Sequence, residues 1–247
     1  MSGRLHPHLR LARVRAHKLA RLARDRSYWP ALRRGVAAAV EHADIPFDPA
    51  TKTVLDVGAS RGQFALFATR RFPGTAIVSF EPLPDACAVL EEVTAHRVDA
   101  RRTAIGATRG EADINVSSSD DSSSLLPIGA RQVSEFPGTE TDHTIVVPVS
   151  TLDDEIPTEP ERPCLLKLDV QGLELDVLKG ATRTLDWVDE ALIECSFVEL
   201  YEGQALADEI VTFMHEAGLG LAGVHEVTYS ADGSAIQADF FFKRRKR

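Results

Sequence analysis

The sequence has few cysteines and no long apolar run, and these two shortages exclude several classes of protein. No stretch of its 247 residues reaches the ~20 apolar residues that a membrane-spanning helix needs. The first residues lead into charged sequence, so we expect no secretory signal. Cys87, Cys164 and Cys195 form no C-x-x-C pair and no metal-binding spacing. We therefore expect buried, reduced thiols and a cytoplasmic protein.

Acidic residues are scarce near the amino terminus, although the formal net charge of the chain is −9. Asp25 is the single acid before Gly35, among nine arginines and one lysine, and residues 243–247 form a second basic run. The middle of the chain is correspondingly acidic, which makes nucleic acid an unlikely partner. The basic N-terminal segment could make a weak contact with an anionic surface.

Residues 1–45 predict an N-terminal helical cap. A helical apolar stripe runs through Leu5, Leu9, Ala12, Ala16, Leu19 and Ala23. Trp29, Leu32, Val36 and Ala39 continue this rhythm after a break near Pro30, which indicates a second helix. Such a cap could pack on the rest of the chain, on a second copy in a homodimer, or on anionic lipid.

Residues 46–247 predict one α/β domain, because strand patterns alternate with helix patterns. The apolar runs favour strands at residues 53–57, 76–80, 103–105, 145–149, 165–170, 191–195 and 236–242. Helices are expected at residues 84–95, 174–185 and 206–217, with another containing Phe64 and Phe67. Residues 117–124 are rich in Ser and Asp and predict a loop. The expected fold is Rossmann-like, with a mostly parallel sheet and helices on both faces.

The strongest motif is the turn after the first of these strands. The strand carries Asp56 near its end, and Gly58 and Gly62 follow before the next helix. Gly58 can adopt backbone angles that other residues avoid, and Gly62 leaves room for a ligand or a strand. Glu81 ends the second strand about 20 residues further on, where an acid suits the two hydroxyls of a ribose.

The missing G-x-G-x-x-G motif decides which nucleoside is expected. A dinucleotide brings a pyrophosphate, which that motif holds through backbone amides. Here the turn is G-x-x-x-G, and Asp56 would repel a pyrophosphate. S-adenosylmethionine has no phosphate and carries a sulfonium and an ammonium, which Asp56 favours. The sequence therefore predicts an S-adenosylmethionine site rather than an NAD site.

Several segments together resemble the FkbM-type methyltransferases, a family of the class I methyltransferase fold. The similarity runs from about residue 52 to at least residue 220, so it excludes the cap. The matching segments are residues 54–62, 80–84, 104–106, 121–126, 151–153, 166–174 and 178–181. The resemblance implies O-methylation of sugars, polyketides or related natural products. The expected cofactor-binding residues are Asp56, Gly58, Ala59, Ser60, Gly62, Glu81, Pro82 and Ile105.

Asp169 and Glu194 predict the catalytic centre, because each follows an apolar strand at the carboxyl edge of the sheet. One carboxylate could take the proton of an acceptor hydroxyl. Alternatively, both could hold Mg²⁺ or Mn²⁺, which would acidify that hydroxyl. Lys167 is expected beneath the site as an ion-pair partner. His143 and His225 are further candidate bases, both expected in loops.

The acceptor is expected to be a small hydroxylated molecule. Its predicted contacts are Ser123, Ser124, Gln171, Glu174 and Tyr201. Asp169 could instead cap the following helix, and Glu174 could simply stabilise its first turn. Two other functions stay open: an NAD(P)-binding oxidoreductase, and a non-catalytic S-adenosylmethionine-binding module. RNA methylation is disfavoured, because no Asn/Asp-Pro-Pro-aromatic base pocket is present.

Overall fold

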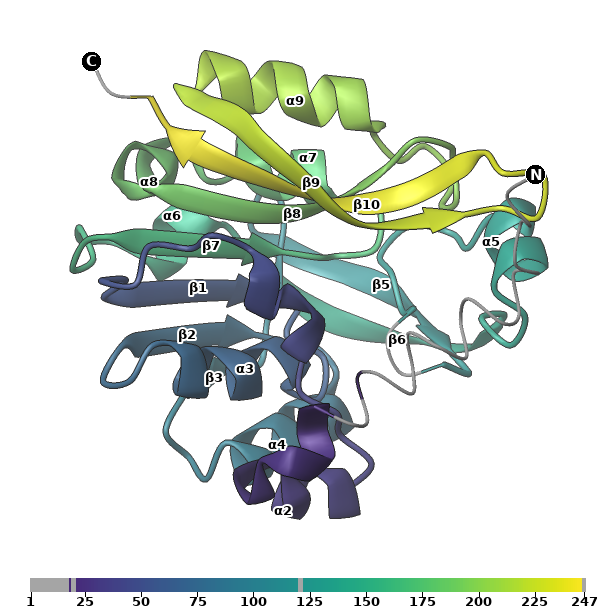
Figure 1. Cartoon of the computed structure of the whole chain (residues 1–247). Helices are drawn as coiled ribbons and strands as arrows, with labels where there is room; N and C mark the ends of the chain where they lie inside the picture. Colours follow the sequence, from purple (N-terminus) through teal and green to yellow (C-terminus); the bar gives the residue numbers. More distant parts are fainter. Residues whose placement is uncertain (1–17, 19–20, 120–121, 246–247) are drawn as a thin grey trace, which may run out of the picture.

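The structure is a computed structural model that describes residue 18 and residues 21–119 and 122–245. Its centre is a seven-stranded sheet of order β3-β2-β1-β7-β8-β10-β9 (Figure 1). Neighbouring strands from β3 to β8 are parallel, whereas β10 runs antiparallel to both β8 and β9. The strands are β1 (Thr53–Val57), β2 (Ala76–Phe80), β3 (Asp99–Arg101), β7 (Cys164–Leu168), β8 (Glu190–Ser196), β9 (Leu219–Tyr229) and β10 (Ala235–Arg244). The predicted Rossmann-like class I methyltransferase fold is confirmed.

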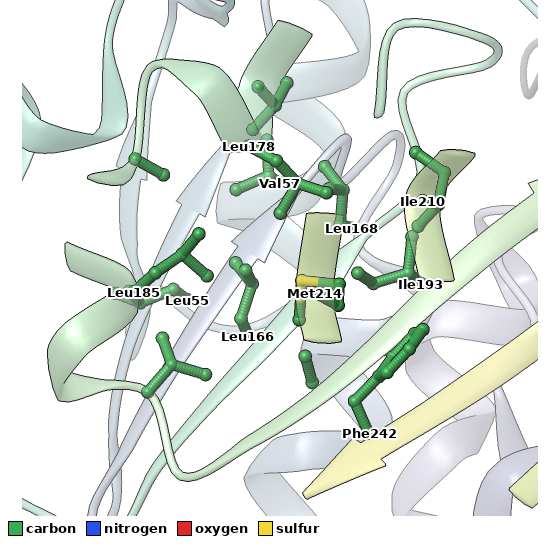
Figure 2. Packing of buried hydrophobic residues seen from close by; sticks show 14 of the residues in the cluster. Leu55, Val57, Leu166, Leu168, Leu178, Leu185, Ile193, Ile210, Met214 and Phe242 are labelled. Carbon is green, nitrogen blue, oxygen red and sulfur yellow. The ribbon is translucent and has the colours of Figure 1, made fainter. Parts of the chain in front are cut away.

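Alternating side chains of the central strands pack against helices on the two faces of the sheet. Val54, Leu165 and Phe241 belong to the core beneath α3 (Gln63–Arg71). Leu55 and Leu166 face the other way, toward α7 (Glu174–Lys179), α8 (Thr182–Trp187) and α9 (Ala207–Glu216). Figure 2 shows this second core, in which leucines of the strands meet aliphatic side chains of the helices. Strands that are buried on both faces carry apolar residues at nearly every position, so these strands could be predicted from the sequence.

A smaller sheet of order β4-β6-β5 lies beside the carboxyl ends of the main strands (Figure 1). It contains β4 (Ala104–Ile105), β5 (Gly110–Ser117) and β6 (Thr141–Ser150). The remaining helices are α4 (Pro84–Val93), α5 (Ala130–Glu135) and α6 (Leu152–Glu155). Strands β3, β5 and β9 and helices α5 and α6 were not predicted, since they are short or largely exposed.

The described part of the predicted cap is broken into short turns. Residues 21–24 are helical, and η1 (Arg26–Tyr28), α2 (Trp29–Arg33) and η2 (Val40–Asp44) follow. The expected continuation of the second helix to Ala39 is wrong, because Gly35 turns the chain with a φ of 74°. Val36 instead packs with Leu22 and Leu66. The rest of the apolar stripe, residues 1–17 and 19–20, lies outside the described residues.

Two further expectations need correction. The helix predicted at 174–185 is split into α7 and α8 at Gly180, where a Cβ would lie 2.1 Å from the Gly106 carbonyl oxygen. His143 and His225 lie within β6 and β9 rather than in loops. The loop predicted at 117–124 is packed against the protein where it is described, because Ser122 and Ser124 are buried and Ser124 bridges to Asn115.

The three cysteines are buried and unpaired, as predicted. Burial raises the pKa of Cys164 to about 12, so this thiol stays protonated at neutral pH. Within the described ranges, no helix combines the length and apolar character that crossing a membrane would require.

Replacement of Leu166 by Ala tests the second core. Leu166 has no exposed surface, so its truncation should lower the free energy of unfolding by about 2–5 kcal/mol. Urea denaturation followed by circular dichroism measures this change. Val146→Ala is the control, because Val146 is 64% exposed and its truncation should cost less than about 0.5 kcal/mol. Equal losses in the two variants would contradict the packing described.

Candidate active site

A cavity of about 400 Å³ lies at the carboxyl ends of β1, β2 and β7. In a parallel sheet this edge is where ligands bind. Most of the predicted cofactor and acceptor residues meet here: Gly58, Ala59, Ser60, Glu81, Pro82, Ile105, Ser123, Ser124, Asp169 and Gln171 line the cavity. The cap adds Lys18, Gly35, Glu41 and His42, none of which was predicted at the site.

The turn between β1 and α3 is held by close backbone contacts. Gly58 has a φ of 79°, and a Cβ there would lie 1.7 Å from the Asp169 carbonyl oxygen. Ser60 follows with a φ of 47°, an uncommon value for a residue with a side chain. Gly62 lies against Leu90 of α4 and is not among the residues that line the cavity. Gly58 therefore allows β1 and β7 to approach, whereas Gly62 allows a helix to approach.

Glu81 ties this turn to the end of β2. Its carboxylate accepts hydrogen bonds from the Ser60 and Leu83 amides, each at 2.8 Å. The residue is only 6% exposed, but it lines the cavity. Burial raises the pKa of Glu81 to about 7, although the two amide hydrogen bonds act to lower it. The two amide hydrogen bonds thus fix the carboxylate at the wall of this cavity.

Asp56 lies beneath the cavity and does not line it. Its side chain is fully buried and accepts a hydrogen bond of 3.1 Å from the Ser79 hydroxyl. Oδ1 has no hydrogen-bond partner among the described residues. Burial raises the pKa of Asp56 to about 6, opposed by the Lys167 ammonium. Asp56 can therefore act on a cationic ligand through its field or through an ordered water.

Two buried polar atoms of the turn also have no partner within the described part of the chain. They are Ser60 Oγ and Gln63 Oε1, and both residues line the cavity. An unsatisfied buried polar atom costs about 1–3 kcal/mol unless a ligand or water completes it. An amino-acid ammonium would donate to both acceptors. These residues therefore fit the methionine end of S-adenosylmethionine, and Gln63 is a candidate that sequence reasoning missed.

The end of β7 carries a network of charged and amide groups. Lys167 lies 3.0 Å from Asp169, which confirms the expected ion pair. The Gln171 amide nitrogen donates to Asp169 at 2.7 Å and to Glu194 at 3.1 Å. Burial, and then the charges of Asp169 and Asp239, raise the pKa of Glu194 well above its usual value. Asp169 does not cap α7, since its carboxylate is held by Lys167 and Gln171.

Gln171 connects this network to the serine-rich segment. Its φ is 55°, and its Oε1 accepts a hydrogen bond of 2.6 Å from the Tyr201 hydroxyl. The Ser124 hydroxyl donates to the Gln171 carbonyl at 2.7 Å. Tyr201 is 2% exposed and stands behind the wall of the cavity. Glu174 is also buried, and it accepts hydrogen bonds from the backbone amides of residues 170 and 172.

A second cavity, of about 710 Å³, adjoins the first beneath the cap. Both cavities are lined by Lys18, Glu41, His42, Lys167 and Asp169. The other lining residues come from the cap and from β8, β9 and β10: Arg21, Val40, Asp44, Glu194, Glu226, Thr228 and Asp239. All of these lining residues except Val40 carry a polar or charged side chain.

The histidine that reaches both cavities is His42. Its Nε2 lies 2.9 Å from Asp239 Oδ2, and both side chains are buried. His143 is exposed on β6 beside Asp142 and lines neither cavity. His225 pairs with Asp239 across β9 and β10 but is likewise absent from both linings. His42 was missed because one histidine in a short helical segment carries no motif.

Asp169 and Glu194 were also predicted as a metal site. The structure brings them together, but the Gln171 amide nitrogen fills the space between their oxygens. The Tyr201 hydroxyl holds Gln171 Oε1, which fixes the amide in this orientation. No cluster of three or more acidic, histidine or cysteine ligands occurs among residues 18, 21–119 and 122–245. This donor set does not fit a divalent cation.

The comparison of the sequence with family profiles decides the family. The profile described as the Methyltransferase FkbM domain matches residues 56–219. The chain belongs to the FkbM methyltransferase family. Its turn, Glu81 and the β7 network all lie within the matched residues, whereas the cap and β10 lie outside them.

Curated relatives are similar at low identity. Methyltransferase 1 of Beauveria bassiana is 27% identical over 193 residues, covering 72% of this chain and 75% of that protein. The 2-O-methyltransferase NoeI of Sinorhizobium fredii is 31% identical over 160 residues, covering 61% and 66%. The hexuronic acid methyltransferase AglP of Haloferax volcanii is 30% identical over 140 residues, covering 56% and 54%. The FkbM chain thus aligns with about half to three quarters of the length of these proteins.

Gly58→Ala should greatly weaken cofactor binding. The new Cβ would collide with the Asp169 carbonyl, so the turn and β7 must separate. S-adenosylhomocysteine titration by calorimetry should detect at least about 100-fold weaker binding, equivalent to about 3 kcal/mol. Gly74→Ala is the matched control, because Gly74 has a φ of 82° with no atom within 4 Å. The control should lose about 1–2 kcal/mol of stability and retain full affinity.

Cofactor affinity should depend on pH through Glu81. A raised pKa of about 7 means that the carboxyl takes up a proton as the pH falls below 7. Ribose hydroxyls bind the ionised form, so the dissociation constant of S-adenosylhomocysteine should rise about tenfold from pH 8 to pH 6. Glu81→Gln should bind weakly at both pH values and lose most of this dependence. A pH-independent wild type would contradict the assignment of Glu81.

Proposed function

We propose that this FkbM protein transfers a methyl group from S-adenosylmethionine to a hydroxyl oxygen of a sugar or glycoside. The observation that carries the proposal is the lining of the second cavity. Among its twelve described lining residues, Val40 is the single apolar one. Side chains of this kind offer hydrogen-bond partners for many hydroxyls, as a sugar requires. The name of AglP, a hexuronic acid methyltransferase, supports a sugar acceptor, and the name of NoeI, a 2-O-methyltransferase, supports transfer to oxygen.

In this proposal each cavity binds one of the two reactants. The first holds the cofactor, which supplies a methyl group on a positively charged sulfur. Glu81 accepts from the ribose, while Ser60 and Gln63 receive the ammonium of the methionine end. The second holds the acceptor. Since the two cavities meet at Asp169 and Lys167, an acceptor hydroxyl placed there faces the methyl group.

Asp169 and Gln171 position the acceptor in this scheme. Hydrogen bonds from Lys167 and Gln171 fix the Asp169 carboxylate. Its remaining lone pairs can accept a hydrogen bond from the hydroxyl of the methyl acceptor. Holding the oxygen in line with the methyl carbon and sulfur accounts for much of the rate enhancement in methyl transfer. Ser123 and Ser124 line the first cavity and not the second, so they would contact the acceptor only where it extends toward the cofactor.

An acceptor screen tests the proposal. The purified protein is incubated with S-adenosylmethionine and neutral hexoses, deoxyhexoses, uronic acids and their glycosides, and S-adenosylhomocysteine is quantified. We expect turnover with at least one class and a methyl ether that survives mild base, whereas a methyl ester would be hydrolysed. Chelation with EDTA should leave the rate unchanged. Cofactor binding without turnover on any acceptor would contradict the proposal and favour a non-catalytic module.

Asp169→Asn tests the positioning role once an acceptor is found. The amide keeps the shape of the side chain but loses the charge that pairs with Lys167. We expect a fall of about 100-fold in kcat/KM with little change in S-adenosylhomocysteine affinity. Asp186→Asn is the matched control, because Asp186 is an exposed carboxylate at the end of α8. Equal activity of the two variants would exclude a role for Asp169 in the reaction.

A further inference from the structure

We propose that His42 is the general base of the reaction and that Asp239 positions it. The inference rests on the proposed methyl transfer to a hydroxyl and adds the residue that receives the proton. His42 comes from η2 of the cap, and Asp239 comes from β10. Both lie outside the segment that matches the FkbM family profile, residues 56–219. The base is therefore supplied by the flanks of the family domain.

The geometry is that of a hydrogen-bonded dyad. His42 Nε2 and Asp239 Oδ2 are 2.9 Å apart, with side-chain exposures of 8% and 11%. The imidazole packs against Phe64 and Phe67 of α3, with ring centroids 5.6 and 6.2 Å away. Burial acts to raise the pKa of Asp239, but the hydrogen bond from His42 lowers it, so this carboxyl stays ionised. The ring is held on one side by a charge and on its faces by aromatic contacts.

The second ring nitrogen is left for a ligand. Nδ1 is buried and has no hydrogen-bond partner among the described residues. Because an ionised carboxylate only accepts, the neutral ring must carry its proton on Nε2, and Nδ1 presents a lone pair. His42 lines both cavities, so it stands where the cofactor and acceptor spaces meet. We assign the hydroxyl of the methyl acceptor, bound at that junction, as the hydrogen-bond partner of Nδ1.

The carboxylates of the β7 network accept hydrogen bonds from protein groups, whereas His42 Nδ1 accepts none from the described residues. Asp169 accepts a hydrogen bond from Lys167 on one oxygen and from Gln171 on the other. Glu194 accepts a hydrogen bond from Gln237 on one oxygen and from Gln171 on the other. Donors at both oxygens suit these carboxylates to orienting an acceptor. His42 Nδ1 has no such competing donor.

The proton transfer balances the reaction. As a lone pair of the acceptor oxygen forms the new bond to the methyl carbon, the carbon–sulfur bond breaks and its electron pair stays on sulfur. The hydroxyl proton moves to His42 Nδ1. The positive charge of the sulfonium is lost while an imidazolium forms beside Asp239, so the net charge of the closed site is unchanged. The proton leaves to water when the products dissociate.

Charged groups of both signs surround the ring. Those that interact with His42 or line both cavities with it are Asp239 and Glu226 on the β9–β10 hairpin, Asp56 on β1, Lys167 and Asp169 at the end of β7, and Lys18 and Glu41 in the cap. His225 on β9 interacts with the same Asp239 and Glu226. Carboxylates outnumber the ammonium groups in this set. An imidazolium formed during turnover would keep the Asp239 carboxylate as its hydrogen-bond partner.

Histidine replacement tests the base. His42→Gln should lower kcat by at least about 100-fold, the usual contribution of a general base, while S-adenosylhomocysteine affinity stays within about twofold. Log kcat should fall with decreasing pH in the wild type and lose that acid limb in His42→Gln. Asp239→Asn should lower kcat about tenfold or more and shift the limb. His215→Gln, an exposed histidine on α9, is the matched control. Wild-type kcat in His42→Gln would overturn the proposal.

A second measurement needs no acceptor. Long-range ¹H–¹⁵N NMR reports which ring nitrogen carries the proton, and the His42 signals are assigned from their loss in His42→Gln. We expect the Nε2–H form in the wild type and a mixture of forms in Asp239→Asn. A predominant Nδ1–H form would refute the dyad, whether or not an acceptor is known. The expected tautomer without turnover on any hydroxylated acceptor would instead contradict the proposed reaction.

Discussion

The buried ammonium of Lys167 is the interaction on which the active site depends. Burial acts to lower the pKa of this lysine, but Asp169, Asp239, Asp56 and Glu194 together raise it. Those carboxylates come from four strands, β1, β7, β8 and β10, or from the residues directly after them. Without one central cation, their mutual repulsion in a site of low dielectric would oppose the packing of the sheet. The excess of acid that remains favours a cationic ligand and a cationic intermediate state of the reaction.

Close backbone contacts join β1 and β7 at the carboxyl ends of these strands. Gly58 touches the Asp169 carbonyl, and the Asp169 amide donates to the Val57 carbonyl at 3.0 Å. The cofactor turn and the acceptor-orienting carboxylate are therefore parts of one rigid unit. Residues with unusual backbone angles, Ser60 and Gln171, flank that contact on either side. Strained residues gather at sites whose surroundings over-determine them, and here both bear on the reacting centre.

Much of the fold and of the cofactor half of the site was predictable. Strands β1, β2, β7 and β8 are apolar at nearly every position, because helices cover both faces of the sheet, and this pattern is visible in one dimension. Glu81 was predictable from its place at the end of β2. Strand β9 was not predicted, because it is an edge strand with Gly220, Gly223 and several exposed side chains. The break in the 174–185 helix depends on Gly106, a residue distant in the chain.

Local pattern alone specified the order of strands and helices, the glycine turn and the acids at the strand ends, since each follows from neighbours along the chain. The junction of the two cavities depends instead on tertiary structure. Asp239 was read only as part of a strand, and His42 as one residue of the cap, yet the fold places them 2.9 Å apart across 197 residues of sequence. No periodicity encodes that meeting. It arises because β10 inserts between β8 and β9, which carries Asp239 beneath the cap.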